Sequence, residues 1–219
     1  MLRCHGVGSA GQGGLGDHAV RARDPNPQYN PDMKSILHSA ARQWEQLLPK
    51  LCDLEEPLTR LGQTLMDCWA RRGKVLIAGN GGSAADAMHL AEELVVRFKK
   101  NRRALAAIAL CDPTVLTCAG NDFSYDQVFA RQIEALGNPG DVFIAFSTSG
   151  NSKNIILAIQ QAKAQQLRTA ALLGHDGGQC RGLADIEMIV PSDDSARVQE
   201  AHQMLFHSLC QWIDEQPLR

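Results

Sequence analysis

From Lys74 onward, short apolar runs alternate with segments of helical periodicity, and this alternation constrains the fold more than any other feature. Every run is apolar over most of its length, which is typical of strands that are buried on both faces of a sheet. Strands that alternate with helices form a parallel sheet covered by helices on both sides. The sequence therefore predicts a doubly wound α/β fold with five parallel strands. The runs are KVLIAG, LAAIAL, DVFIAF, RTAALLG and IEMIV, which begin at Lys74, Leu105, Asp141, Arg168 and Ile186.

Helices are expected both before and between these strands. Apolar residues recur every three to four positions from Met33 to about Leu51 and from about Glu55 to Arg71, and Gly73 follows the second segment. These segments are predicted to form two amphipathic helices. The pair Asp112-Pro113 is a favourable helix start, with a capping side chain and proline at the first helical position. Further helices are expected over about 83–98, 125–136, 153–165 and 196–215.

The first 32 residues have a different composition from the rest. The segments GQGGLG and DPNPQYNPD lack periodicity and are rich in helix breakers. Such composition is typical of disorder, so we expect a dispensable, disordered tail over 1–32. The remainder, 33–219, is predicted to be a single domain made of a helical pair (33–72) and an α/β core (73–219).

Charge and cysteine usage exclude several classes of protein. The 22 Lys and Arg residues nearly balance the 24 Asp and Glu residues, so no strongly basic surface for nucleic acid is expected. No apolar run approaches the roughly 18–20 residues that a membrane span needs. The seven cysteines are scattered and form no CxxC pair, which argues against a disulfide framework and a structural zinc cluster. These observations predict a cytoplasmic protein that binds neither nucleic acid nor membrane.

Two loops rich in small residues follow the first and third predicted strands, and each leads into a helix. They are GNGGSAADA, starting at Gly79, and STSGNS, starting at Ser147. Ligands of open α/β sheets bind beyond the carboxyl ends of the strands, where helix N-termini attract anions. A capped turn is the alternative interpretation of either loop alone. Two such loops in one sheet favour phosphate binding, and neither matches a dinucleotide or nucleoside triphosphate fingerprint.

Polar residues on two helices are candidates for chemistry. His89 and Glu93 are four residues apart and share a helix face, which suits a divalent metal. An ordinary half-buried histidine beside a solvated glutamate remains the alternative. On the last helix, Gln199 and His207 are eight residues apart, or about 12 Å along the axis. They reach one ion only if both side chains turn inward or if different subunits contribute. Asn121-Asp122, expected just after a short helix and near a strand end, is a further polar pair, with a plain turn as its alternative.

Four segments, taken in order and spacing, resemble the phosphoheptose isomerase branch of the sugar isomerase (SIS) domain family. They are AGNGGSAADAMHLAEEL, AGNDFSYDQVF, FSTSGNS and VPSDDSARVQEAHQMLFH. The resemblance extends from about Met33 to Glu215, and the combination is far more specific than either loop. It implies a flavodoxin-like SIS fold and a homotetramer with active sites between subunits. It also implies the conversion of D-sedoheptulose 7-phosphate to D-glycero-D-manno-heptose 7-phosphate, the first step toward activated heptoses.

The resemblance also implies site residues. Glu93 and His207 become the candidate acid/base pair for proton transfer through an enediol. One zinc ion per subunit is expected on His89, Glu93, Gln199 and His207. Contacts to the phosphorylated seven-carbon sugar are expected from Asn80, Gly81, Gly82, Ser83, Arg97, Asn121, Asp122, Ser147, Thr148, Ser149, Ser152 and Gln199.

One position departs from the family pattern, and two other functions remain open. Ala196 occupies a position where some members carry aspartate, although Asp194 is two residues away. A related branch forms a non-catalytic tetramer that binds the replication initiator, and the SARVQE stretch resembles that branch as well. The presence of both Glu93 and His207 favours the enzyme. An SIS isomerase for another sugar phosphate is the second alternative.

Overall fold

A five-stranded parallel sheet forms the centre of the molecule, in a computed structural model that describes residues 32–217. The strand order is β2-β1-β3-β4-β5, and all four pairings are parallel. This is the flavodoxin-like order of doubly wound folds, which confirms the predicted fold class. The strands are β1 (Val75–Gly79), β2 (Ala107–Ala109), β3 (Val142–Ser147), β4 (Arg168–Gly174) and β5 (Ile186–Val190).

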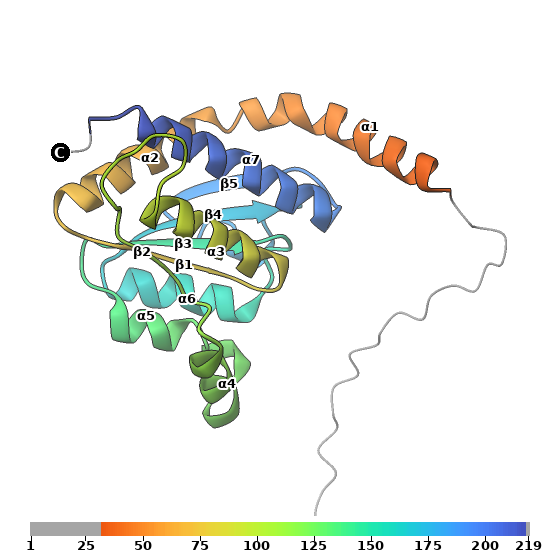
Figure 1. Cartoon of the computed structure of the whole chain (residues 1–219). Coiled ribbons are helices and arrows are strands. Elements are labelled where there is room, and N and C mark those ends of the chain that lie inside the picture. The colour runs from red at the N-terminus through yellow and green to blue at the C-terminus, as the bar shows by residue number, and fades with distance from the viewer. Residues whose placement is uncertain (1–31, 218–219) are drawn as a thin grey trace, which may run out of the picture.

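Helices cover both faces of the sheet (Figure 1). On one face lie α2, α3 and α7, with α1 packed along α7 and extending beyond it. On the other face lie α5 and α6, and α4 projects beside them. The bounds are α1 (Met33–Cys52), α2 (Glu55–Ala70), α3 (Gly82–Val95), α4 (Pro113–Asp122), α5 (Ala130–Leu136), α6 (Lys153–Ala164) and α7 (Ser195–Asp214).

The strands alternate their side chains between two apolar layers. Along β1, Val75 and Ile77 pack under α2, α3 and α7, whereas Leu76 and Ala78 pack against α5 and α6. All four side chains are fully buried. Burial on both faces explains why the strands are apolar runs without polar alternation.

The path of the chain places the carboxyl ends of β1 and β3 side by side. From β1 the chain runs through α3 to the edge strand β2, then returns on the opposite face to β3. Gly79 at the end of β1 is the register partner of Phe146 in β3. Ligands of this fold class bind at such a switch point, where the connections leave in opposite directions. Both loops singled out in the sequence start here.

Three predicted boundaries were wrong. The single helix expected over 125–136 is divided into a 3₁₀ turn, η1 (Tyr125–Gln127), and α5, because the chain bends to bury Val128 and Phe129 in the core. The helix expected to end near Phe98 ends at Val95. Asn121 and Asp122 were expected after a helix but form the last residues of α4.

The N-terminal prediction is only partly covered by the structure. Residues 1–31 of the predicted tail lie outside the described residues, and Asp32 caps α1 through a hydrogen bond from the backbone N–H of Ser35. The first half of α1 exposes a row of large apolar side chains, Met33, Ile36 and Leu37. Between residues 32 and 217, no helix combines the length and apolarity needed to cross a membrane.

Candidate active site

The first loop turns sharply from β1 into α3, and its glycines permit that turn. A Cβ atom on Gly79 would lie 2.3 Å from the carbonyl oxygen of Ser83. Gly81 caps α3 with a positive φ of 56°, a conformation that favours glycine. The N–H of Ser83 bonds to the Asn80 carbonyl oxygen at 3.0 Å, whereas the N–H of Gly82, the first residue of α3, is available to an anion.

The second loop places its hydroxyl side chains at the start of α6. A Cβ on Gly150, where φ is 63°, would lie 1.9 Å from the carbonyl oxygen of Gly177, so only glycine fits. The Oγ atom of Ser147 accepts a hydrogen bond from the Gly150 N–H. Ser152 is the N-cap of α6, yet its hydroxyl makes no capping hydrogen bond. That hydroxyl therefore remains available to a ligand at the helix N-terminus.

An amide pair that sequence reasoning missed connects the two loops. The Nδ2 atom of Asn80 donates to Oδ1 of Asn154 at 2.9 Å, and Nδ2 of Asn154 donates to Oδ1 of Asn80 at 2.9 Å. The hydroxyl of Tyr125 donates to the same Asn80 oxygen at 3.0 Å. Asn154 is buried in the first turn of α6. Its only sequence signal is its place directly after STSGNS, so the contact with Asn80 could not be foreseen.

Helices α3 and α7 lie parallel and in register, and they carry the candidate acid/base and metal-binding residues. Near the loops, Gly82 packs so closely on the Gln199 amide that a Cβ on Gly82 would lie 2.3 Å from Gln199 Nε2. One turn further, Nε2 of Gln203 donates to the buried Asp86 carboxylate at 3.0 Å. Burial raises the pKa of Asp86, although the Gln203 hydrogen bond opposes that rise.

Two turns from the loops, His89, Glu93 and His207 meet in a cluster. One possible ligand atom from each lies within 4.8 Å of the others. The Nε2 atom of His89 lies 3.4 Å from Glu93 Oε1 and 3.4 Å from His207 Nε2. The Glu93 side chain is 14% exposed, so the cluster is half-buried rather than fully solvated. His89 is seven positions after Gly82, which puts the cluster about 10 Å from the first loop along α3.

Aromatic rings enclose the imidazole of His207. Phe98 stacks on it with centroids 5.4 Å apart, and Phe206 meets it edge-on. Burial lowers the pKa of His207 below its ordinary value, and the neighbouring His89 lowers it further. His207 is therefore neutral at pH 7, and a neutral imidazole can accept a proton or bind a metal.

Some predicted residues are not brought to this cluster within one chain. Gln199 lies at the loop end of α7, against Gly82, rather than beside His207. Arg97 is exposed after α3 and makes no hydrogen bond or ion pair with the described residues. Asn121 donates to Asp122 at 2.8 Å, and both are exposed on the projecting α4 (Figure 1).

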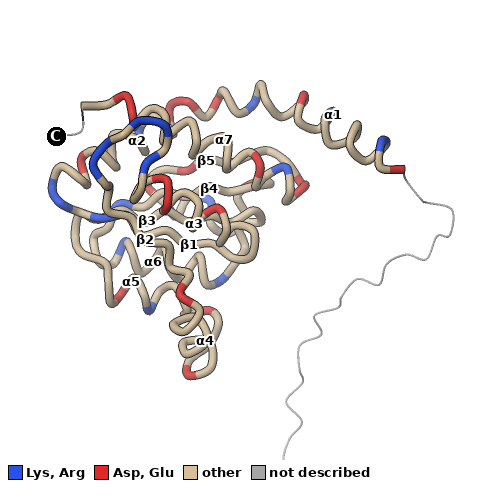
Figure 2. Tube along the Cα trace, viewed as in Figure 1, with Lys and Arg blue, Asp and Glu red and all other residues tan. Residues whose placement is uncertain are grey.

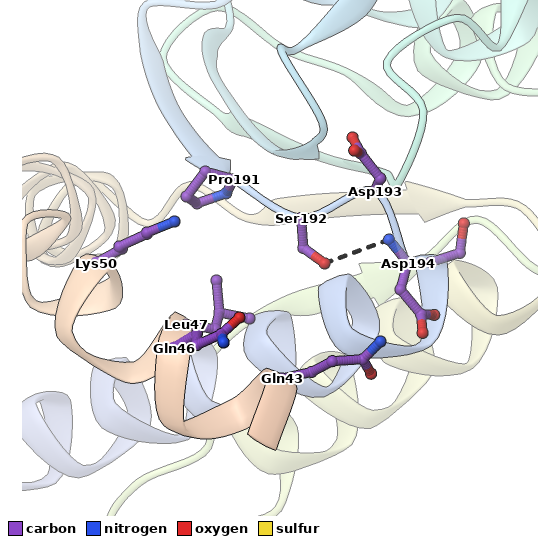
Figure 3. Close-up of a pocket in the computed structure, with 9 residues that line it drawn as sticks. Gln43, Gln46, Leu47, Lys50, Pro191, Ser192, Asp193 and Asp194 are labelled. Atoms are coloured by element: carbon purple, nitrogen blue, oxygen red, sulfur yellow. Dashed lines mark hydrogen bonds between the residues drawn. The ribbon is translucent and has the colours of Figure 1, made fainter. Parts of the chain in front are cut away.

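A pocket of about 580 Å³ opens beside the second loop, between α1 and the segment before α7 (Figure 3). Ser195 lines it and donates a hydrogen bond to Thr148 Oγ1 at 3.3 Å. The Asp194 carboxylate accepts from the backbone N–H of Ala196, so it caps α7. The carboxylate of Asp194 is thus used to cap the helix, next to Ala196, the position at which the sequence departs from the family pattern.

Comparisons with known proteins identify the family of the chain. Residues 37–174 match the SIS domain family. The curated phosphoheptose isomerase of Paramagnetospirillum magneticum is 52% identical over 162 residues, which cover 74% of this chain and 84% of that protein. The chain belongs to the phosphoheptose isomerase branch of the SIS domain family.

Solved phosphoheptose isomerases share the whole described fold. The enzyme from Neisseria gonorrhoeae has a TM-score of 0.80 at 36% identity, and the match covers 84% of this chain and 100% of that one. The one from Francisella tularensis has a TM-score of 0.81 at 33% identity, with 85% and 100% covered. The predicted resemblance and fold are confirmed. The roles of individual site residues stay predictions.

Proposed function

We propose that this chain interconverts D-sedoheptulose 7-phosphate and D-glycero-D-manno-heptose 7-phosphate, the first step toward activated heptoses for cell-surface glycans. The observation that carries the proposal is the meeting of His89, Glu93 and His207 about 10 Å along α3 from the first of two phosphate-type loops. A phosphorylated sugar chain anchored at one end can then extend toward a cluster of acid/base groups. Membership of the phosphoheptose isomerase branch supports the choice of sugar.

The phosphate anchor consists of the two helix N-termini and the hydroxyls around them. The start of α3 offers the backbone N–H of Gly82, and the start of α6 adds the hydroxyl of Ser152. The reciprocal amides of Asn80 and Asn154 hold the two helix starts at a constant separation. Ser147, Thr148 and Ser149 complete this anchor. Each needs only to rotate its hydroxyl hydrogen to donate toward a phosphate oxygen.

Isomerisation needs one group that moves a carbon-bound proton and another that serves the oxygens. The Glu93 carboxylate removes a proton from C1 of the ketose, which forms the double bond between C1 and C2 and leaves a negative charge on O2. The neutral His207 then accepts the proton from O1 and passes it to O2, and Glu93 returns its proton to C2, which leaves the aldehyde at C1. Each group ends the cycle in its starting protonation state. The lowered pKa of His207 suits this exchange near neutral pH.

The cluster also fits the predicted zinc ion. Two atoms bound tetrahedrally to zinc at about 2.0–2.1 Å lie about 3.4 Å apart. The separations of His89 Nε2 from Glu93 Oε1 and from His207 Nε2 are both 3.4 Å. Two histidines and one glutamate are the donor set of catalytic zinc sites with an open fourth position. When bound, zinc polarises the substrate carbonyl and stabilises the developing oxyanion. Gln199 would approach this cluster only through a movement of its side chain or from another subunit.

We further propose a cytoplasmic homotetramer with active sites between subunits. Asn121 and Asp122 are exposed on α4, which projects from the domain, and Arg97 is exposed beyond α3. Residues that the family places around the substrate therefore remain accessible to a neighbouring chain. The apolar row on α1, formed by Met33, Ile36 and Leu37, supplies a surface for assembly. Analytical ultracentrifugation measures the mass directly, and a monomer at micromolar concentration would contradict the proposal.

Steady-state kinetics with sedoheptulose 7-phosphate tests the function. Glu93→Gln keeps the shape but removes the base, and His207→Ala removes the imidazole. Each variant should lower kcat by at least about a hundredfold while calorimetry still detects substrate binding. Glu134→Gln, which changes an exposed glutamate on α5 on the other face of the sheet, is the matched control and should keep the wild-type kcat. The double variant should lose less than the product of the single losses, because the pair works as a unit.

Two results would contradict this function. Near wild-type turnover in both single variants would make Glu93 and His207 structural. A wild-type protein that binds the sugar phosphate without turning it over would instead favour a binding scaffold.

A further inference from the structure

A buried ion pair joins the ends of the two helices that carry the acid/base cluster. Arg102 lies in the segment between α3 and β2, and its Nε donates to Oδ1 of Asp214 in the last turn of α7 at 2.9 Å. The two side chains are 6% and 1% exposed. Figure 2 shows that this segment is rich in Lys and Arg. Of these cations, Arg102 has a buried side chain. A charge is buried only where partners compensate for its lost hydration.

The guanidinium of Arg102 also closes the carboxyl end of α3. Its Nη2 donates to the carbonyl oxygen of Glu93 at 2.7 Å, and its Nη1 donates to that of Leu94 at 2.9 Å. The last carbonyls of a helix have no partners within the helix. Arg102 satisfies two of them, and one belongs to the candidate base itself. The position of the Glu93 backbone is therefore tied to this guanidinium.

Asp214 holds the segment between α3 and β2 on the side of the cluster where His207 lies. Its Oδ2 accepts from the backbone N–H groups of Lys99 and Lys100, at 2.8 and 2.9 Å. Phe98, the preceding residue, stacks its ring on the imidazole of His207 with an interplanar angle of 18°. The carboxylate thus determines where the chain turns after Phe98. One ion pair holds the Glu93 backbone and the ring that covers His207.

We propose that Arg102 and Asp214 are positioning residues for the proton-transfer cluster, an inference that rests on the function proposed above. Neither residue forms a hydrogen bond or ion pair with the side chains of the cluster among the described residues. Arg102 acts through the α3 backbone, and Asp214 acts through the segment that carries Phe98. Arg102 meets α3 at Glu93, about three turns from Gly82, and Asp214 is about five turns from the start of α7. The pair therefore influences the reacting end of the sugar and leaves its anchor unchanged.

The chain contains a second buried carboxylate with the same bonding, which serves as a matched control. Asp141, just before β3, accepts from the backbone N–H groups of Lys74 and Asn138 and pairs with the Lys74 ammonium. Like Asp214, it binds two N–H groups and one cation. It lies at the amino end of the sheet, opposite the loops. Asp141→Asn therefore removes equivalent bonding without touching α3 or α7.

The test compares Asp214→Asn with Asp141→Asn in the full-length protein. In each variant an amide N–H₂ faces groups that are themselves donors, so we expect the melting temperature to fall in both. Only Asp214→Asn should lower kcat and Zn²⁺ affinity, each by about 10–100-fold, as is usual for groups that orient metal ligands. KM should stay within about twofold of wild type in both variants. Affinity is measured by competition with a chromogenic chelator, and kinetics well below both melting temperatures.

Arg102→Lys provides a second measurement that is less sensitive to folding. It keeps the positive charge beside Asp214, but one ammonium cannot reproduce the fork that reaches both α3 carbonyls. A lower kcat with a near wild-type melting temperature supports the proposal, and it decides the question if Asp214→Asn does not fold. Equal losses of kcat in Asp214→Asn and Asp141→Asn, or wild-type kcat in Arg102→Lys, overturn it. If the wild type does not turn over the sugar, the proposed function fails, and the Zn²⁺ affinities alone decide the positioning role.

Discussion

The buried imidazole of His202 predicts a specific loss of stability in mild acid. His202 lies on α7 with no exposed surface, and its Nε2 is 3.2 Å from the carbonyl oxygen of Leu173. That contact requires Nε2 to carry the proton, and Nδ1 has no hydrogen-bond partner among the described residues. Burial lowers the pKa of His202 from 6.5 to about 4, although the Leu173 hydrogen bond opposes the shift. The folded protein therefore keeps this ring neutral where the unfolded chain protonates it.

The sign and size of the effect follow from the two pKa values. Above pH 6.5 the ring is neutral in both states, so it adds no pH dependence. As the pH falls from 6.5 toward 4, the unfolded chain binds a proton that the folded chain does not, and stability is lost. At about 1.4 kcal/mol per pKa unit, the loss is about 2 kcal/mol at pH 5 and about 3 kcal/mol once the pH falls below 4.

Urea unfolding at pH 7 and pH 5 measures this loss in wild type and in His202→Gln. Glutamine can donate to Leu173 but does not titrate between these pH values. Subtracting the two proteins cancels the contributions of all other titrating groups, including Asp86. The wild type should lose about 2 kcal/mol more than the variant between pH 7 and pH 5. His38→Gln, an exposed histidine on α1, should behave like wild type. An equal loss in wild type and His202→Gln would refute the assignment of a buried, neutral ring.

Three further predictions concern the ligand sites. Ser149→Ala should raise KM roughly 10–150-fold by removing a charge-assisted hydrogen bond to phosphate, and an unchanged KM would exclude Ser149 as an anchor. Gly82→Ala places a methyl group against the Gln199 amide and should lower kcat/KM; combined with Gln199→Ala, it should lose less than the product of the single effects. Dialysis against a chelator should lower both activity and melting temperature, and His89→Ala should lower bound zinc by elemental analysis. Fully active protein without any divalent metal would contradict the zinc assignment but not the acid/base pair.

Strand positions could be predicted because the signal is local. The runs beginning at Arg168 and Ile186 coincide with β4 and β5 at both ends, since charged or turn-forming residues bound each apolar run. The start of α4 at Pro113 could also be predicted from the sequence, because Asp112 caps the helix and proline is favoured at its first position. The break in the helix at Val128 and Phe129 could not be predicted, because it results from the burial of these side chains against residues that are distant in the sequence.

Site residues divide in the same way. The pair His89 and Glu93 could be read from a four-residue spacing on one helix. His207 could be placed beside them only through the family resemblance, because nothing local says that α7 lies against α3. The segment RFKKNRR, from Arg97 to Arg103, resembles an ordinary solvated run of charge. Only the fold brings Asp214 next to Arg102 and lets Arg102 hydrogen-bond the last carbonyl groups of α3.

The parallel register of α3 and α7 explains why this sheet can support two-point recognition of a sugar phosphate. Both helices start at the carboxyl edge of the sheet, so their N-termini lie beside the phosphate and each further turn moves away from it. Gly82, Asp86 and His89 each contact a residue of α7 that lies 117 or 118 positions later in the sequence. Because this offset is nearly constant, the two helices stay side by side over this length. The separation between anchor and acid/base cluster is therefore set by helix rise, about 1.5 Å per residue, and not by loop conformation. A site on two rigid helices keeps this separation constant during turnover. A sugar phosphate shorter by two carbons should then bind with similar KM but place its carbonyl short of Glu93, and lose mainly kcat.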